Sequence, residues 1–416
     1  MKAMTHVSRR VALRLLTALL PLLATGIAGR VEAQPPKTAG ADRWLVQGPA
    51  YSHTVDSAVP GRAVVAVRPR AEVGEPSWSG AGSSAPRAIT TEVRIASEPG
   101  VTLAGTLYLP TGHSKGPYPL AVLFPGRGPN GRGGGFSEII KRLTADGIAA
   151  LEYDKRGVGE STGTYEEDAY RLAADAAAAV AAMRHRPDIA GSRIALVGHS
   201  QGGVVAPAAA AADRDIAAVV TLAGAVGDGL PYVRKGLYRQ IMKIIPGGRD
   251  ALAVPAVDAV MALLQARVDS RDADTITRLR ANVVDRFAAA GFPRPQAEQA
   301  LTMIDVPETW KANKFRSASD LKALHMPVLA IYGTKDPMAL DDAPAARTAL
   351  ASNSRARVVM LDGLGHSFQE GVVTGTPDEV SNSGPYLGSP RLVTLVGDWL
   401  RDALSSKGGK AMRQVR

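Results

Sequence analysis

A serine flanked by glycines is the clearest candidate for chemistry in this sequence. Ser200 lies in the pentapeptide Gly198-His-Ser-Gln-Gly202, after the apolar run 193–197 and before the small-residue run 203–212. This order predicts a strand, a sharp turn and a helix, which lifts the hydroxyl clear of the sheet. The helix N-terminus then favours negative charge that develops beside the hydroxyl. Ser200 is therefore the candidate nucleophile.

A second Gly-x-Ser-x-Gly pattern provides an internal comparison. Ser161 has the same glycine spacing, in Gly159-Glu-Ser-Thr-Gly163. A loop precedes this serine, because the nearest predicted strand already ends near Asp154. No strand leads directly into a helix here, so the context favours Ser200 over Ser161.

The seven histidines of the chain narrow the search for a general base. A serine hydroxyl needs a base within hydrogen-bonding reach, and that base must itself be oriented by a third group. His199 adjoins Ser200 and is expected to point elsewhere. Only His366, in the glycine-rich loop 362–368, follows the last predicted strand. His366 is therefore the predicted general base.

The orienting acid should follow another strand, between the serine and the histidine in chain order. Asp336, in Gly333-Thr-Lys-Asp336-Pro, directly follows the strand predicted at 328–332. It is the predicted orienting acid. Asp228, which follows the preceding strand at 217–222, is the alternative.

Backbone amides near the serine could stabilise the negative oxygen of an acyl-transfer intermediate. One predicted donor is the N–H of Gln201, directly after the nucleophile. The second should come from the loop 125–129 after the strand that ends at Phe124. Arg127 is the predicted donor and Gly128 is the alternative, while an ordinary Gly-Pro turn is the competing interpretation of this loop.

No metal and no cofactor are expected. The sequence has no His-Glu-x-x-His motif and no cysteine, so it lacks the usual zinc patterns and has no disulfides. The stretch 126–131 matches Gly-x-Gly-x-x-Gly by letter, but it lacks the Lys-Ser/Thr pair of a phosphate loop, and Pro129 removes an amide. Dinucleotide binding is therefore not expected.

Apolar strand patterns that alternate with helical patterns must position these residues. Two paired strands are predicted at 91–96 and 102–109. They are followed by predicted strands at 120–124, 148–153, 193–197, 217–222, 328–332 and 357–361. Because parallel neighbours need helical crossovers, the fold class is α/β with a doubly wound, mainly parallel sheet.

The predicted core, residues 89–225 and 321–405, is interrupted by a long helical insertion. The insertion, residues 226–320, far exceeds the dozen or so residues that a crossover needs. We interpret it as a helical cap over the strand ends, where ligands bind in open α/β sheets. A packing insertion away from the site is the alternative.

The terminal segments differ from the core. Residues 1–33 combine basic residues with an apolar stretch and small residues for cleavage, which predicts a signal peptide and a periplasmic or secreted protein. A twin-arginine signal at Arg9 and Arg10 and the general secretory route are both open, and a membrane span is a lesser alternative. Residues 34–88 form a Pro/Gly/Ser-rich extension, and residues 406–416 a disordered basic tail.

Composition limits the partners. Without residues 1–33 the net charge of +10 falls to 44 − 38 = +6, a mild surplus spread along the chain with no groove-reading motif, so nucleic-acid binding is not expected. Membrane contact is a minor alternative. A small-molecule ester or a short peptide is the expected partner.

The motifs in their order resemble α/β-hydrolases of the carboxylesterase and serine-aminopeptidase-like branch. The resemblance covers about residues 90–405 and rests on segments 103–110, 124–129, 153–163, 198–203, 333–336 and 365–366. It implies a serine hydrolase that cleaves carboxylic esters through an acyl-enzyme, with Ser200, His366 and Asp336 as catalytic triad. A serine peptidase or a thioesterase on the same triad, and a non-catalytic binding module, are the alternatives. Pro207, inside the helix after the serine, departs from the pattern.

Overall fold

The computed structural model describes residues 68–69, 88–112, 116–133, 135–227, 229–244, 250–307, 310, 316–336, 338–371 and 386–405. The predicted signal peptide 1–33 and tail 406–416 lie outside these residues. So do nearly all of the extension 34–88 and the alternative acid Asp228.

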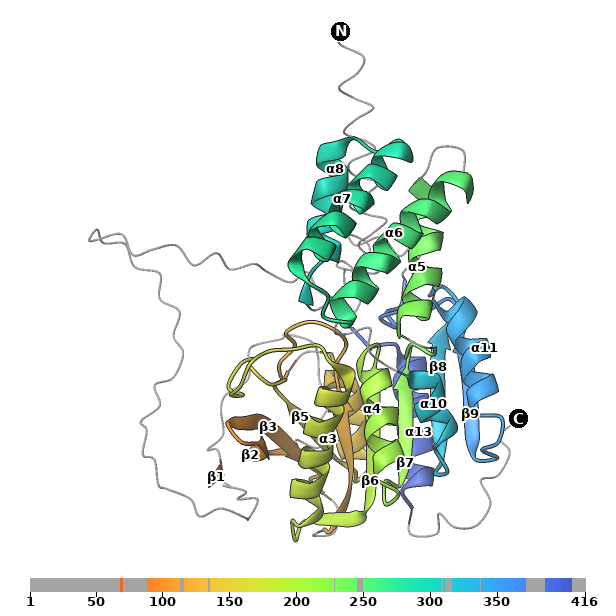
Figure 1. Cartoon of the computed structure of the whole chain (residues 1–416). Coiled ribbons are helices and arrows are strands. Elements are labelled where there is room, and N and C mark those ends of the chain that lie inside the picture. The colour runs from red at the N-terminus through yellow and green to blue at the C-terminus, as the bar shows by residue number, and fades with distance from the viewer. Residues whose placement is uncertain are drawn as a thin grey trace, which may run out of the picture.

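A mainly parallel sheet forms the centre of the molecule (Figure 1). Within the described residues it has nine strands in the order β1-β2-β3-β5-β4-β6-β7-β8-β9. Their bounds are β1 Arg68–Pro69, β2 Ile89–Glu98, β3 Val101–Leu109, β4 Tyr118–Phe124, β5 Ala149–Tyr153, β6 Ile189–His199, β7 Ala218–Leu222, β8 Val328–Gly333 and β9 Ala356–Leu361. The pairs from β5 to β9 are parallel, whereas β1, β2, β3 and β5 pair antiparallel.

Helices cover both faces of this sheet. On one face lie α3 Ala169–Arg184, α4 Gly202–Ala212, α10 Ser317–Lys322 and α11 Ala339–Ala349; on the other lie α2 Ser137–Ala145 and α13 Pro390–Ala403. Strand β4 shows the consequence, because Val122 packs into the first layer and Leu123 into the second. Each fully buried side chain of this size contributes about 1.5–3 kcal/mol to folding. The predicted doubly wound α/β class is confirmed.

Among the described residues, four further helices stand above the carboxyl ends of the strands (Figure 1). They are α5 Gly229–Ile244, α6 Asp250–Val268, α7 Ala273–Ala289 and α8 Arg294–Ile304. They share an apolar core of their own, which includes Val257, Leu263 and Phe287. The predicted cap boundary at residue 320 falls inside α10, whose Leu321 packs with the sheet layer rather than with the cap.

Helix α6 is long and apolar enough to cross a membrane by length and composition, the single such helix found in the described residues. Its apolar side chains have another use. Val257, Val260, Leu263 and Leu264 are buried in the core of the cap, where they pack with α5 and α7.

Candidate active site

Ser200 occupies a tight turn between β6 and α4. Its φ of 54° lies in the left-handed region, which is strained for a residue other than glycine. The flanking glycines make the turn possible. A Cβ at Gly198 would lie 1.9 Å from the carbonyl oxygen of Gly202, and one at Gly202 would lie 2.0 Å from that of Phe124. The predicted strand-turn-helix at Ser200 is therefore present.

Two hydrogen bonds join Ser200, His366 and Asp336. Nε2 of His366 lies 3.0 Å from Oγ of Ser200, and Nδ1 lies 2.8 Å from Oδ2 of Asp336. An ionised carboxylate can only accept, so Nδ1–H donates to Asp336 and Nε2 is free to accept from the serine hydroxyl. The three residues follow β6, β9 and β8, whose carboxyl ends meet at one edge of the sheet.

Charge and burial oppose each other in this group. Burial alone would raise the pKa of Asp336, but the nearby His366 and a hydrogen bond from the Met338 N–H outweigh it, so its pKa is below the ordinary value. Burial would lower the pKa of His366, but the Asp336 carboxylate outweighs that and raises it. Asp336 is thus ionised at neutral pH and stabilises a protonated His366.

The loop after β4 lies directly against the serine. A Cβ at Gly126 would lie 3.3 Å from Cβ of Ser200. Among the described residues, the backbone N–H groups of Arg127 and Gln201 donate to no backbone carbonyl. The alternative donor Gly128 is engaged, because its N–H donates to Oε1 of Glu167 at 2.7 Å. Of the two candidates in this loop, the amide of Arg127 is therefore the available one.

Ser161 lies in a different setting. Its buried hydroxyl donates to the carbonyl of Asp154 at 2.7 Å and accepts from the N–H of Ala104 at 2.9 Å. These bonds tie the loop after β5 to strand β3. Ser161 is thus a structural serine, and the second Gly-x-Ser-x-Gly pattern forms no strand-to-helix turn.

His199 has a place that the sequence analysis missed. Its Nε2 donates to the carbonyl of His366 at 2.9 Å, and its Nδ1 accepts from the Tyr386 hydroxyl at 2.6 Å. Burial lowers the pKa of His199 to about 3, so the ring is neutral. His199 therefore fastens the loop that carries His366 to the turn that carries Ser200. Nothing in the spacing of the sequence signals this contact.

The cap contacts the same edge of the sheet through a buried carboxylate. Asp342, in the first turn of α11, accepts from the hydroxyl of Tyr232 in α5 at 2.9 Å and from the N–H of Val226 at 3.0 Å. Burial raises the pKa of Asp342 to about 7. Since α11 begins just after Asp336, this contact places the start of the cap beside the candidate site, as a cap over the strand ends requires.

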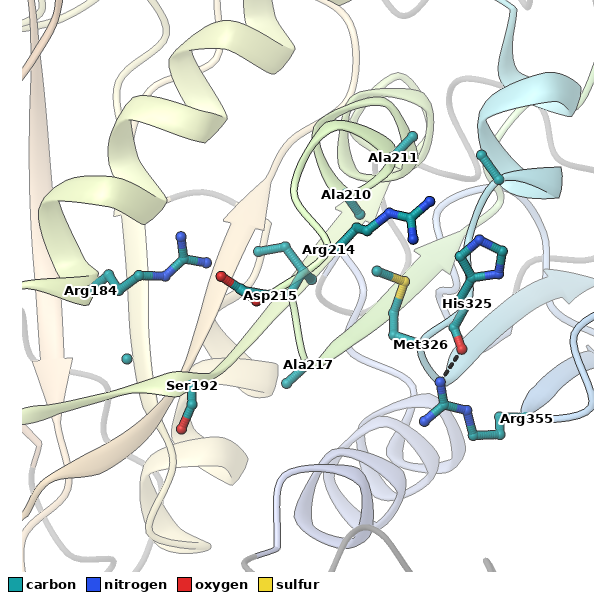
Figure 2. A pocket seen from close by; sticks show the side chains of 13 residues that line it. Arg184, Ser192, Ala210, Ala211, Arg214, Asp215, Ala217, His325, Met326 and Arg355 are labelled. Carbon is teal, nitrogen blue, oxygen red and sulfur yellow. Dashed lines mark hydrogen bonds between the residues drawn. The ribbon is translucent and has the colours of Figure 1, made fainter.

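A hollow of about 840 Å³ lies at the opposite edge of the sheet (Figure 2). Arg184, Arg214, His325 and Arg355 are among its lining residues, and the guanidinium of Arg355 donates to the carbonyl of His325. The lining residues lie at or before the beginnings of β6, β7, β8 and β9, whereas Ser200 lies where β6 ends. The hollow is therefore separate from the candidate site.

Known proteins share the fold. A family model described as the alpha/beta hydrolase family matches residues 121–382, more than half of the chain. No curated protein matches the sequence. Similar solved structures include DcsB with a substrate analogue (18% identity, 76% of this chain, 100% of that chain, TM-score 0.47) and acetyl xylan esterase 1 from a Thermoanaerobacterium species (15%, 83%, 89%, 0.45). Est1E from Butyrivibrio proteoclasticus with ferulic acid is another (16%, 76%, 99%, 0.44).

Proposed function

The chain belongs to the alpha/beta hydrolase family, and on that premise we propose that it is a serine hydrolase that cleaves carboxylic esters through an acyl-enzyme. The observation that carries the proposal is the unbroken pair of hydrogen bonds, 3.0 Å and 2.8 Å, from Ser200 through His366 to Asp336. This arrangement supplies a nucleophile, its base and the group that orients the base.

In the proposed reaction, Oγ of Ser200 attacks the ester carbonyl while Nε2 of His366 removes the hydroxyl proton. The N–H groups of Gln201 and Arg127 donate to the oxygen of the tetrahedral intermediate, which bears the negative charge. His366 then gives the proton to the leaving alkoxide, and an acyl-enzyme on Ser200 is left. A water molecule then attacks the acyl carbonyl while Nε2 of His366 removes its proton. His366 returns this proton to Oγ of Ser200, and the carboxylic acid leaves.

A substrate panel tests this proposal. The mature protein should hydrolyse p-nitrophenyl esters with short acyl chains and should bind a fluorophosphonate covalently at Ser200. Aminoacyl anilides and acyl thioesters belong in the same panel, because peptidases and thioesterases use the same triad chemistry. Higher kcat/KM on anilides or thioesters would reassign the substrate class. Absence of both turnover and labelling would leave the non-catalytic binding module.

The pH dependence follows from His366. Only its neutral form can accept the serine proton, so we expect kcat/KM for a neutral ester to rise with pH as His366 loses its proton. Because Asp336 raises the pKa of His366, with Asp342 acting in the same direction, the midpoint should lie above the ordinary histidine value of about 6.5. Initial rates between pH 5 and 7.5 measure this limb. A flat profile there would contradict a role for His366 as base.

We further propose that residues 1–33 direct export to the periplasm or medium, where a small-molecule ester would be the substrate. The combination of Arg9, Arg10 and the apolar stretch that follows supports this. Cell fractionation with N-terminal sequencing of the exported chain tests it. Replacing Arg9 and Arg10 by lysine should block a twin-arginine route and leave general secretion intact.

A further inference from the structure

Lys155 is a buried lysine just after β5 that the proposed reaction does not use. Its Nζ donates three hydrogen bonds, to the carbonyls of Gly126 at 2.7 Å and Gly128 at 3.0 Å and to Oε1 of Gln201 at 2.9 Å. An ammonium group has three N–H donors and no acceptor, so every N–H of the charged Lys155 is hydrogen-bonded. All three acceptors lie beside the serine, in the loop after β4 or at the residue after Ser200.

The bond to Gly126 determines where the next amide points. In a planar trans peptide the carbonyl of Gly126 and the N–H of Arg127 face opposite ways. By holding that carbonyl on its own side, Lys155 directs the Arg127 N–H away from itself. Nδ2 of Asn130 donates to the carbonyls of Gly126 and Arg127, both at 2.9 Å, and so fixes the same peptides.

The bond to Gln201 connects the same ammonium group to the other predicted donor. The side chain of Gln201 accepts from Lys155 at its oxygen and donates from Nε2 to the carbonyl of Glu167 at 3.2 Å. Glu167 in turn accepts the N–H of Gly128 at 2.7 Å. Lys155, Gln201 and Glu167 therefore link the loop after β4 to the turn that carries Ser200.

We propose that Lys155 is a positioning residue that holds the N–H groups of Arg127 and Gln201 in register to receive the negatively charged oxygen. The inference rests on the proposed serine hydrolase function and adds a residue to it. Lys155 does not touch the substrate; it acts through the two backbone segments that it joins. Its contribution is made in the transition state, where the negative charge develops, so its loss should lower kcat more than it changes KM.

The charge of Lys155 also gives the proposal a pH signature. Burial lowers the pKa of Lys155 to about 8; the Glu167 carboxylate, 3.7 Å from Nζ, raises it, and the Arg127 guanidinium lowers it. The turn at Ser200 contacts this lysine through the uncharged side chain of Gln201. When the ammonium loses its proton, one of its three donors is lost. The rate should therefore fall in the mildly alkaline range.

Lys155→Met is the direct test, because methionine fills a similar volume without donating. We expect a 10- to 100-fold lower kcat on a p-nitrophenyl ester, with KM changed less than about threefold, since one lost oxyanion donor costs about 10²–10³ in kcat. A trifluoromethyl ketone, which forms a tetrahedral adduct with the serine, should bind more weakly by a similar factor. Lys141→Met, at an exposed lysine of α2, is the matched control and should match the wild type.

Glu167→Gln gives a second, independent readout. Glutamine keeps a carbonyl oxygen for the Gly128 N–H but removes the charge that raises the pKa of Lys155. The alkaline limb of kcat should therefore move to lower pH, while the acid limb set by His366 stays in place. A purely structural contact would lower the rate at all pH values without moving this limb. The readout also stands if Lys155→Met fails to fold, which thermal melting would show.

The outcomes separate the two proposals. An active wild type with an equally active, folded Lys155→Met variant would overturn the role of Lys155 and leave the serine hydrolase intact. Coincident alkaline limbs in the wild type and Glu167→Gln would also overturn it. A wild type that neither hydrolyses esters nor reacts with the fluorophosphonate at Ser200 would contradict the proposed function, and this inference with it.

Discussion

Ser200→Ala should lower kcat for ester hydrolysis by about 10⁶-fold, because the nucleophile, the base and the orienting acid act as one unit. Alanine removes Oγ, the atom that lies 3.0 Å from Nε2 of His366, and leaves the base with no proton to accept. The variant should also lose all covalent labelling by a fluorophosphonate. Mass spectrometry of the labelled wild-type peptide and initial rates on a p-nitrophenyl ester measure both effects.

Ser161→Ala is the matched control, since Ser161 has the same flanking glycines. Its hydroxyl bonds to Ala104 and Asp154 in the interior, so its removal should cost about 1–3 kcal/mol of unfolding free energy. Labelling at Ser200 and kcat should be close to those of the wild type at a temperature where the variant is folded. Label attached to Ser161 would show that the nucleophile has been assigned to the wrong serine.

Asp336→Asn should lower kcat by about 10⁴-fold with the fold intact, as the same change does in a serine protease triad. With its oxygen kept on the Met338 N–H, the asparagine presents its NH2 group to Nδ1 of His366 and donates to it, so the ring is stabilised in the tautomer that cannot take the serine proton. The charge that raises the pKa of His366 is also lost. The residual activity should therefore have its acid limb at lower pH than the wild type.

Asp362→Asn controls for this variant. Asp362 begins the same loop as His366, is exposed, and accepts from the Thr334 hydroxyl at 3.0 Å. Its substitution should change kcat by less than about twofold, since surface changes rarely perturb a site. Near-normal turnover in Asp336→Asn, with an unshifted pH profile, would remove Asp336 as the orienting acid. Asp228, which lies outside the described residues, would then be the next candidate to test.

The order of strands and helices along the chain could be predicted because each element has its own local sequence pattern. The apolar runs at 193–197 and 328–332 lie within β6 Ile189–His199 and β8 Val328–Gly333. Strands buried on both faces need continuous apolar residues, so they are visible without any partner. The cap could be predicted for a similar reason, because the insertion is far longer than a crossover needs. The place of α10 could not be predicted, since a helix of six residues is too short to show which core it packs against.

The turn at Ser200 was also local information. Gly198 and Gly202 are required by backbone contacts within a few residues of the serine, so the pentapeptide itself specifies the turn. The choice between the two Gly-x-Ser-x-Gly patterns followed from what precedes each one. His366 and Asp336 needed one more rule, that the ends of parallel strands meet at one edge of the sheet. That rule predicts that the carboxyl ends of β6, β8 and β9 lie near one another, but it does not give the distances between the three side chains.

Only the tertiary structure decided how the site is supported. His199 bonds to the carbonyl of His366, and Lys155 bonds to the carbonyl of Gly126 and the side chain of Gln201. The partners in each contact lie far apart in the sequence, and no repeating spacing links them. A lysine in a loop ordinarily suggests an exposed charge, and the carbonyls that it meets carry no sequence signal, because every residue has one. Local patterns therefore indicated the candidate nucleophile and the succession of strands along the chain, whereas the contacts around the two candidate amides form only when distant loops fold together.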